Sequence, residues 1–218
     1  MNVLLLGASG MVGQGVLREC LDAHDVHTVV SLVRQPSRLR HPKLYELVVR
    51  DLACLDDVQF ELRGIDACFF CIGVSASGLN EAAYMRVTYD LTLAVAETLA
   101  RVRPDMTFVY VSGAGTDSSE RGKTMWARVK GRTENALLQL PLKAYMLRPG
   151  LIRPLDGIVS KTPLYRTAYM LTRPFLPLVG ALAPNHITTT RQVGRAMLQL
   201  ARRGSDKRIL EMRDINAL

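Results

Sequence analysis

The chain has 218 residues, of which 48% are hydrophobic, so it can bury a substantial core, and one domain with a small appendage is expected. Its net charge is +8. Its four histidines are His24, His27, His41 and His186. No metal-ligand spacing connects them, so we predict no structural metal.

The N-terminal residues MNVLLLGASG do not form a secretory signal. They lack its basic start and its small-residue cleavage site, because the apolar run of residues 3–6 ends at Gly7. The four cysteines also fit a reducing compartment. We therefore expect an intracellular, cytoplasmic protein.

Charge is distributed unevenly along the chain. Residues 1–120 carry 10 lysines and arginines against 15 acidic residues, a net −5, whereas residues 121–218 carry 18 against 5, a net +13. This split suggests that the second half meets an anionic group on a cofactor, a substrate, a membrane surface or a nucleic acid. The alternative is a solvated arginine-rich face. Nucleic acid is the least favoured partner, because no recognition helix motif or interleaved aromatic residues are present.

Strand and helix patterns alternate through the first 150 residues. An apolar run at 2–6 ends in glycine, and residues 11–21 then have helical apolar spacing. Further strands are predicted at 27–33, 44–49, 67–72, 107–111 and 144–147, and helices at 82–102 and 125–140. Such alternation predicts a Rossmann-type α/β fold, a doubly wound parallel sheet covered on both faces.

The C-terminal part is punctuated by prolines before a helix at 190–203 and a strand at 208–212. We interpret residues 151–218 as a small substrate-side lobe integrated with the core of residues 1–150, so that the chain is a single domain. Within this lobe, residues 164–183 are apolar but interrupted by arginines and prolines, which excludes a membrane-spanning helix. A substrate lid, an oligomer contact and an interfacial anchor with weak membrane affinity remain as alternatives.

A glycine-rich turn lies between the first strand and the first helix. In Gly7-Ala-Ser-Gly-Met-Val-Gly13 the glycines permit a tight turn, close approach to a pyrophosphate and close helix–strand packing, while the helix N-terminus attracts phosphate. We predict that the turn binds a dinucleotide. The contact residues predicted here are Gly7, Ser9, Gly10, Met11, Val12 and Gly13.

The end of the second strand indicates which dinucleotide is bound. An NAD enzyme usually places an acidic residue there, but this chain has Arg34, in SLVRQPSRLR. A guanidinium suits a 2′-phosphate, so NADP(H) is favoured over NAD(H). Arg38 and Arg40 follow closely, and for Arg40 a solvated loop is the preferred interpretation.

Residues at two other strand ends are also placed beside the cofactor. Asp51 and Leu52 follow the third strand and should border the adenine. Cys71, Ile72 and Gly73 end the fourth strand beside the crevice. Cys68 and Cys71 should face opposite sides of the sheet, so they are predicted to be packing residues and not a metal or disulfide pair.

The segments GASGMVG, VRQP, RDL, CFFCIG, YVSGAG, VKGRTENAL and LRPG resemble, in that order, the short-chain dehydrogenase/reductase superfamily. The similarity is closest to its extended and atypical members, of the NAD(P)-binding epimerase/dehydratase and Tat-interacting-protein type. It covers essentially the whole chain. The resemblance implies an active site with a strand-end serine and a tyrosine four residues before a lysine, which holds the nicotinamide ribose.

Carried onto this chain, the resemblance assigns the lysine to Lys130 and the serine to Ser112, as catalytic residues, with Lys130 also a cofactor ligand. The tyrosine position holds Trp126, which cannot pass a proton near neutral pH, so it is either a wall of the pocket or part of the core. Other candidate proton donors are Ser112, Thr116 and Tyr84, although tyrosines such as Tyr84 and Tyr110 usually pack in these positions. The resemblance also implies nicotinamide contacts, at Pro149, Gly150, Leu151 and Ile152.

The sequence thus predicts an NADP(H)-binding oxidoreductase or epimerase that acts on a small carbonyl or hydroxyl substrate with a non-standard proton donor, in a chain that can also form homo-oligomers. A non-catalytic NADP(H) sensor or scaffold is the alternative, because the family's tyrosine is replaced.

Overall fold

The computed structural model describes residues 1–158 and 187–218, and its centre is a seven-stranded parallel sheet with strand order β3-β2-β1-β4-β5-β6-β9. The strands are β1 (Asn2–Leu6), β2 (Thr28–Val33), β3 (Leu44–Val48), β4 (Ala67–Phe70), β5 (Thr107–Val111), β6 (Lys143–Arg148) and β9 (Ile209–Glu211). The order reverses direction at β1 and β4, which is the signature of the doubly wound fold. The predicted fold class is therefore confirmed.

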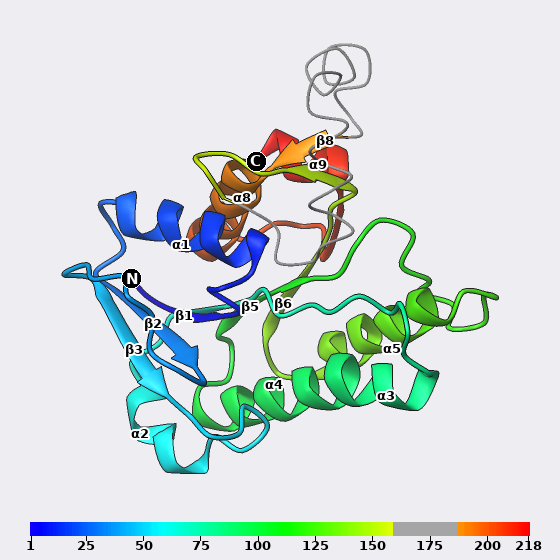
Figure 1. Ribbon diagram of the computed structural model, residues 1–218, viewed down its shortest axis with the longest axis horizontal. Coiled ribbons are helices and arrows are strands. Elements are labelled where there is room, and N and C mark those ends of the chain that lie inside the picture. Colours follow the sequence, from blue (N-terminus) through cyan, green and yellow to red (C-terminus); the bar gives the residue numbers. More distant parts are fainter. Residues whose placement is uncertain (159–186) are drawn as a thin grey trace.

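Helices cover both faces of this sheet (Figure 1). On one face lie α1 (Met11–Asp22) and α8 (Thr190–Arg203), and on the other lie α2 (Gln59–Leu62), α3 (Glu81–Met85), α4 (Leu91–Val102) and α5 (Met125–Gln139). A 3-10 turn, η1 (Asp56–Val58), precedes α2, and α9 (Met212–Ala217) ends the chain. Because both faces are covered, the central strands are apolar throughout.

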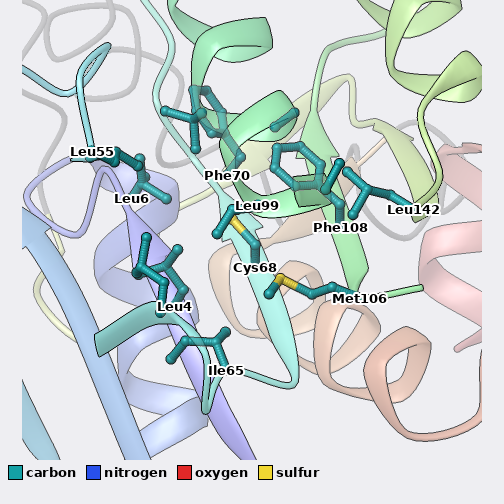
Figure 2. Close-up of a cluster of buried hydrophobic side chains, with 14 of the residues drawn as sticks. Leu4, Leu6, Leu55, Ile65, Cys68, Phe70, Leu99, Met106, Phe108 and Leu142 are labelled. Atoms are coloured by element: carbon teal, nitrogen blue, oxygen red, sulfur yellow. The ribbon is translucent and has the colours of Figure 1, made fainter. Parts of the chain in front are cut away.

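Each face of the sheet has its own core. Figure 2 shows the core beneath α4, where Cys68 packs among aliphatic and aromatic side chains such as Leu99 and Phe108. Cys71 lies against the other core, which α1 and α8 cover. The two cysteines therefore face opposite sides of the sheet, as their spacing predicts.

Some elements differ from the sequence-based expectations. The helix expected over residues 82–102 contains a π-helical turn, η2 (Arg86–Asp90), between α3 and α4. A small parallel sheet of β7 (Leu151–Arg153) and β8 (Ile187–Thr189) was not expected. The segment of residues 164–183, with its three alternative roles, lies outside the described residues.

Much of the C-terminal part belongs to the central architecture. Strand β9 pairs with β6, and α8 lies directly on α1. Two glycines make that contact close: a β-carbon on Gly15 would lie 2.5 Å from Cβ of Thr190, and one on Gly194 would lie 2.8 Å from Cγ of Glu19. A side chain at either position would push the two helices apart.

The uneven charge distribution is partly neutralised within the fold. Arg191 and Arg195 of α8 pair with Glu19 of α1, and Arg202 pairs with Asp25. The basic C-terminal half thus contacts the acidic N-terminal half directly. Among the helices of the described residues, none is long and apolar enough to cross a membrane.

Candidate functional site

All the strands of the central sheet are parallel, so their carboxyl ends share one edge. The predicted site residues follow those ends: Gly7 follows β1, Arg34 follows β2, Cys71 follows β4 and Ser112 follows β5. A ligand crevice in such a sheet lies at this edge, where the strand order reverses between β1 and β4. The sequence motifs therefore converge on one side of the molecule.

The glycine-rich turn is packed too tightly for side chains at two of its positions. Gly7 has a φ of +84°, and a β-carbon there would lie 2.7 Å from the carbonyl carbon of Cys71. A β-carbon on Gly13 would lie 2.0 Å from the carbonyl oxygen of Gly7. The turn is closed by a hydrogen bond of 2.9 Å from the Gly10 amide to the Gly7 carbonyl. These contacts hold the start of α1 against the ends of β1 and β4.

The N-terminus of α1 fits a phosphate group. Its N-cap, Gly10, has an extended backbone and provides no side-chain hydrogen bond to the first turn, and no acidic residue lies in that turn. The first amides of the helix are therefore left for an external acceptor, and the helix dipole favours an anion there. The local geometry suits a dinucleotide pyrophosphate.

Arg34 lies exposed just after β2 and forms no hydrogen bond or ion pair with any other described residue. Its guanidinium is thus open to a ligand. Arg40 differs, because its guanidinium donates to the carbonyls of Ser37 and Leu39 at 2.9 Å. Arg38 is also exposed. Of the three arginines, Arg40 is the one whose guanidinium is held by its own loop.

The residues predicted to border the adenine and the crevice occupy the same edge. Asp51 is exposed, and its carboxylate accepts a hydrogen bond of 2.9 Å from the Ala53 amide, while Leu52 is partly buried. Cys71 is directly beside Gly7, with its Sγ 4.0 Å from Sδ of Met197 on α8. Burial raises the pKa of the Cys71 thiol well above its usual range, so this cysteine is a neutral packing residue. Ile72 and Gly73 follow Cys71 in the chain, beyond the end of β4.

A second cluster lies at the ends of β5 and β6, around Lys130 of α5. The ammonium of Lys130 donates a hydrogen bond to the carbonyl oxygen of Ser112. A β-carbon on Gly113 would lie 3.8 Å from Nζ of Lys130 and 3.9 Å from the Pro149 carbonyl oxygen. Burial lowers the pKa of Lys130 from 10.5 to about 8, although the negative charge of Glu134 opposes the shift. The resemblance-derived lysine, serine and proline are thus neighbours.

Trp126 and Lys130 both face the loop that follows β5. The indole ring lies 3.5 Å from the β-carbon that Gly115 lacks, so the ring packs across this loop next to the lysine cluster. Trp126 is only partly buried. The ring is therefore not fully enclosed in the core.

The candidate hydroxyl donors are engaged elsewhere. The Ser112 hydroxyl donates to the Leu147 carbonyl at 3.0 Å, and the Thr116 hydroxyl donates to the Gly113 carbonyl at 2.7 Å. Tyr84 and Tyr110 are each 2% exposed, and burial raises the pKa of Tyr110 far above its usual range. Both tyrosines are core residues.

The LRPG segment contributes a buried ion pair that sequence reasoning missed. Arg148 donates through Nη2 to Glu134 at 2.5 Å, and Glu134 is fully buried. Arg148 also contacts Glu211 at 3.2 Å and the Ser118 hydroxyl at 2.5 Å. This arginine ties α5 to β6 and β9. The sequence signal for this ion pair was Glu134, which lies one helical turn after Lys130.

A glycine inside α5 sets the distance between this helix and the loop after β5. A β-carbon on Gly131 would lie 1.8 Å from the Asp117 carbonyl oxygen, so only a residue without one allows this approach. A glycine that interrupts a helical pattern was the available sequence signal for the close contact of Gly131.

Beyond Pro149 and Gly150 the chain enters β7, in which Leu151 is 42% exposed and Ile152 is 7% exposed.

Taken with the sheet topology, the phosphate turn defines the chain as a dinucleotide-binding Rossmann protein. A family model described as NAD(P)H-binding matches residues 7–157, which is more than half of the chain. The chain belongs to this NAD(P)H-binding family, and the classification in the short-chain dehydrogenase/reductase superfamily is confirmed.

Two relatives and one solved structure illustrate the similarity. The rat protein HTATIP2 is 28% identical over 155 residues, covering 69% of this chain and 62% of the relative. The mitochondrial protein FMP52 of Eremothecium gossypii is 31% identical over 157 residues, covering 70% and 66%. This chain thus spans less than two thirds of the length of either relative. A short-chain dehydrogenase/reductase oxidoreductase from Burkholderia thailandensis has the same fold, with a TM-score of 0.67, 18% identity and coverage of 94% and 85%.

Proposed function

We propose that the chain is an NADP(H)-dependent oxidoreductase or epimerase that acts on a small carbonyl or hydroxyl substrate. The observation that carries this proposal is Lys130, a partly buried cation at the same sheet edge as the phosphate turn. Within the described part of the chain, no carboxylate forms an ion pair with it. Burying a charge without such a partner is costly, and groups of this kind concentrate at functional sites.

The chain's own residues divide the work of binding and orientation. The N-terminus of α1 would hold the pyrophosphate, and Lys130 would donate to the nicotinamide ribose hydroxyls. Trp126 and the residues after β6 would form walls that exclude water from the reacting groups. When bound, the nicotinamide supplies or accepts the hydride.

Arg34 supports NADP(H) over NAD(H), and its replacement by alanine should remove most of the preference. We expect the natural protein to bind NADPH more tightly than NADH by about 1 to 3 kcal/mol, or roughly 5- to 150-fold, because the guanidinium makes charge-assisted hydrogen bonds to the 2′-phosphate. Calorimetric titration of both cofactors against the natural protein and Arg34→Ala measures the gap.

Arg40→Ala is the matched control for this measurement. It removes the same charge from the same loop, but its guanidinium is already bound to backbone carbonyls. The variant should keep the preference for NADPH. Equal affinity of the natural protein for NADH and NADPH would sink the NADP(H) assignment.

Turnover tests the enzyme itself. We expect the protein to oxidise NADPH with at least one member of a panel of small aldehydes and ketones. The loss of absorbance of the reduced nicotinamide measures this turnover. Failure across the panel, together with tight NADPH binding, would favour the sensor.

The non-catalytic NADP(H) sensor or scaffold is the second candidate, and a specific observation favours it. Trp126 stands at the tyrosine position, and the hydroxyls of Ser112 and Thr116 both donate to backbone carbonyls. A site with no proton donor would bind the cofactor without turning it over.

Binding to membranes or nucleic acid has less support. Several arginines of α8 are paired with acids of the N-terminal half, which reduces the charge left for a polyanion. The cytoplasmic location stays a prediction, and the name of the Eremothecium relative includes the word mitochondrial.

A further inference from the structure

A carbonyl reduction at this site needs a proton as well as a hydride. When the carbonyl carbon gains the hydride, its oxygen becomes an alkoxide that must take a proton from a nearby acid. The acid works best when its pKa is close to the working pH. The residue usually responsible in the superfamily is missing here, because Trp126 occupies its position.

The other nearby groups are poor acids. An indole N–H does not ionise near neutral pH. The hydroxyls of Ser112 and Thr116 already donate hydrogen bonds to the carbonyls of Leu147 and Gly113. The two tyrosines considered above, Tyr84 and Tyr110, are enclosed in the core.

We propose that Lys130 is itself the acid and base of the reaction, a role that rests on the proposed oxidoreductase function. In reduction, the ammonium gives its proton to the substrate oxygen as the carbonyl carbon gains the hydride, and the resulting amine regains a proton from water. In alcohol oxidation, the neutral amine takes the hydroxyl proton. The geometry points to this role because the ammonium lies at the carboxyl end of β5, at the same sheet edge as the glycine-rich turn, where it donates to the Ser112 carbonyl and lies beside Gly113.

The surroundings of Lys130 bring its titration into the working range. Burial lowers its pKa to about 8, so both protonation states are populated in mildly alkaline solution. The charge that opposes this shift is Glu134, one turn along α5, and Glu134 is itself bound by Arg148 of β6. From β5 and the loop after it, Ser112 and Gly113 present only uncharged groups. From β5, Tyr110 faces Glu134 as a neutral phenol, because burial raises the pKa of Tyr110 far above its usual range.

Replacement of Lys130 by arginine separates charge from proton transfer. Lys130→Arg keeps a cation that can bind ribose hydroxyls, but a guanidinium does not release its proton in the working pH range. We expect NADPH affinity by calorimetry to stay within about tenfold while kcat falls by roughly 10²- to 10⁴-fold, the usual contribution of a general acid. Lys123→Arg, an exposed substitution just before α5, is the matched control and should leave both values unchanged.

The pH dependence of kcat should have opposite directions for reduction and for oxidation. Because reduction needs the ammonium, its kcat should fall as the pH rises through about 8, and because oxidation needs the amine, its kcat should rise through the same range. Lys130→Arg should lose both inflections. A lysine that only positions the cofactor through its charge would not make the kcat for oxidation rise as it loses its proton.

A stability measurement without cofactor tests the titration separately from turnover. The folded-state pKa lies below the ordinary value of 10.5, so the charged lysine destabilises the fold below pH 8, and this cost disappears as the pH rises toward 10.5. Relative to Lys130→Met, the natural protein should therefore gain roughly 2 to 4 °C or more in unfolding midpoint between pH 7 and pH 10.5.

The outcomes separate this inference from the proposed function. Turnover that survives in Lys130→Arg with an unchanged pH profile overturns the acid–base role and leaves the oxidoreductase intact. Absence of turnover in the natural protein overturns both. Loss of turnover in Lys130→Arg, with cofactor affinity retained and opposite pH limbs in the natural protein, supports both.

Discussion

Gly13→Ala is expected to abolish measurable cofactor binding and to lower the free energy of unfolding by about 3 kcal/mol or more. The new β-carbon would lie 2.0 Å from the Gly7 carbonyl oxygen. The backbone fixes the position of the β-carbon, and the oxygen is itself a backbone atom, so neither can rotate aside. Helix α1 must therefore move away from the turn, which displaces the amides that face the phosphates. Urea denaturation and calorimetric titration with NADPH measure the two effects.

Gly64→Ala is the control for this substitution. The nearest atom to a β-carbon on Gly64 is Nδ2 of Asn2 at 4.0 Å, and its φ is not in the left-handed region. The change should alter stability by less than about 0.5 kcal/mol and leave NADPH binding intact. If Gly13→Ala binds NADPH as well as Gly64→Ala does, the phosphate-turn assignment is wrong.

Glu134→Ala is expected to cost about 3 to 5 kcal/mol of stability. Glu134 is fully buried and accepts hydrogen bonds from Nε and Nη2 of Arg148, so its removal leaves an arginine side chain that is only 11% exposed without its main partner. The loss should also loosen α5 from β6 and with it the position of Lys130. Denaturant unfolding measures the stability, and the NADPH dissociation constant reports on the lysine.

Glu211→Ala removes the other carboxylate that pairs with the same arginine. The Glu211 side chain is 51% exposed and its contact with Arg148 is 3.2 Å long, so loss of this ion pair should cost below about 1 kcal/mol. Glu211 also caps the N-terminus of α9, and loss of that cap should add about 1 kcal/mol. Both substitutions break an ion pair to Arg148, but only Glu134 is buried, so the cost of Glu134→Ala should still be the larger. A Glu134→Ala cost no larger than that of Glu211→Ala would contradict the buried-pair interpretation.

Local patterns were sufficient for most of the fold. Strand β5, helix α5 and helix α8 lie where apolar periodicity placed them, because the period of the side chains follows from the backbone of each segment alone. The π-helical turn η2 within the predicted helix was missed, since its extra residue does not break the apolar pattern. The pairing of β7 with β8 was also missed, because it joins residues far apart in the chain.

The candidate site was predictable where its chemistry is carried by the backbone. The spacing of Gly7, Gly10 and Gly13 predicts the phosphate turn, because the absence of a side chain is visible in the sequence itself. The exposed Arg34 at the end of β2 followed from its position after an apolar run. The cofactor and catalytic roles of these residues remain to be measured.

The sequence by itself determined the seven central strands, the tight turn at the start of α1 and the replacement of the expected tyrosine by Trp126, because each of these depends only on residues that are close together in the chain. Only the tertiary structure decided which polar groups are still free to react. The Ser112 hydroxyl is bound to Leu147, Glu134 is buried against Arg148, and Lys130 is left with a lowered pKa. Hydrogen-bond partners and burial depend on contacts between distant segments, so the chemical state of each side chain is established only when the sheet and its helices assemble.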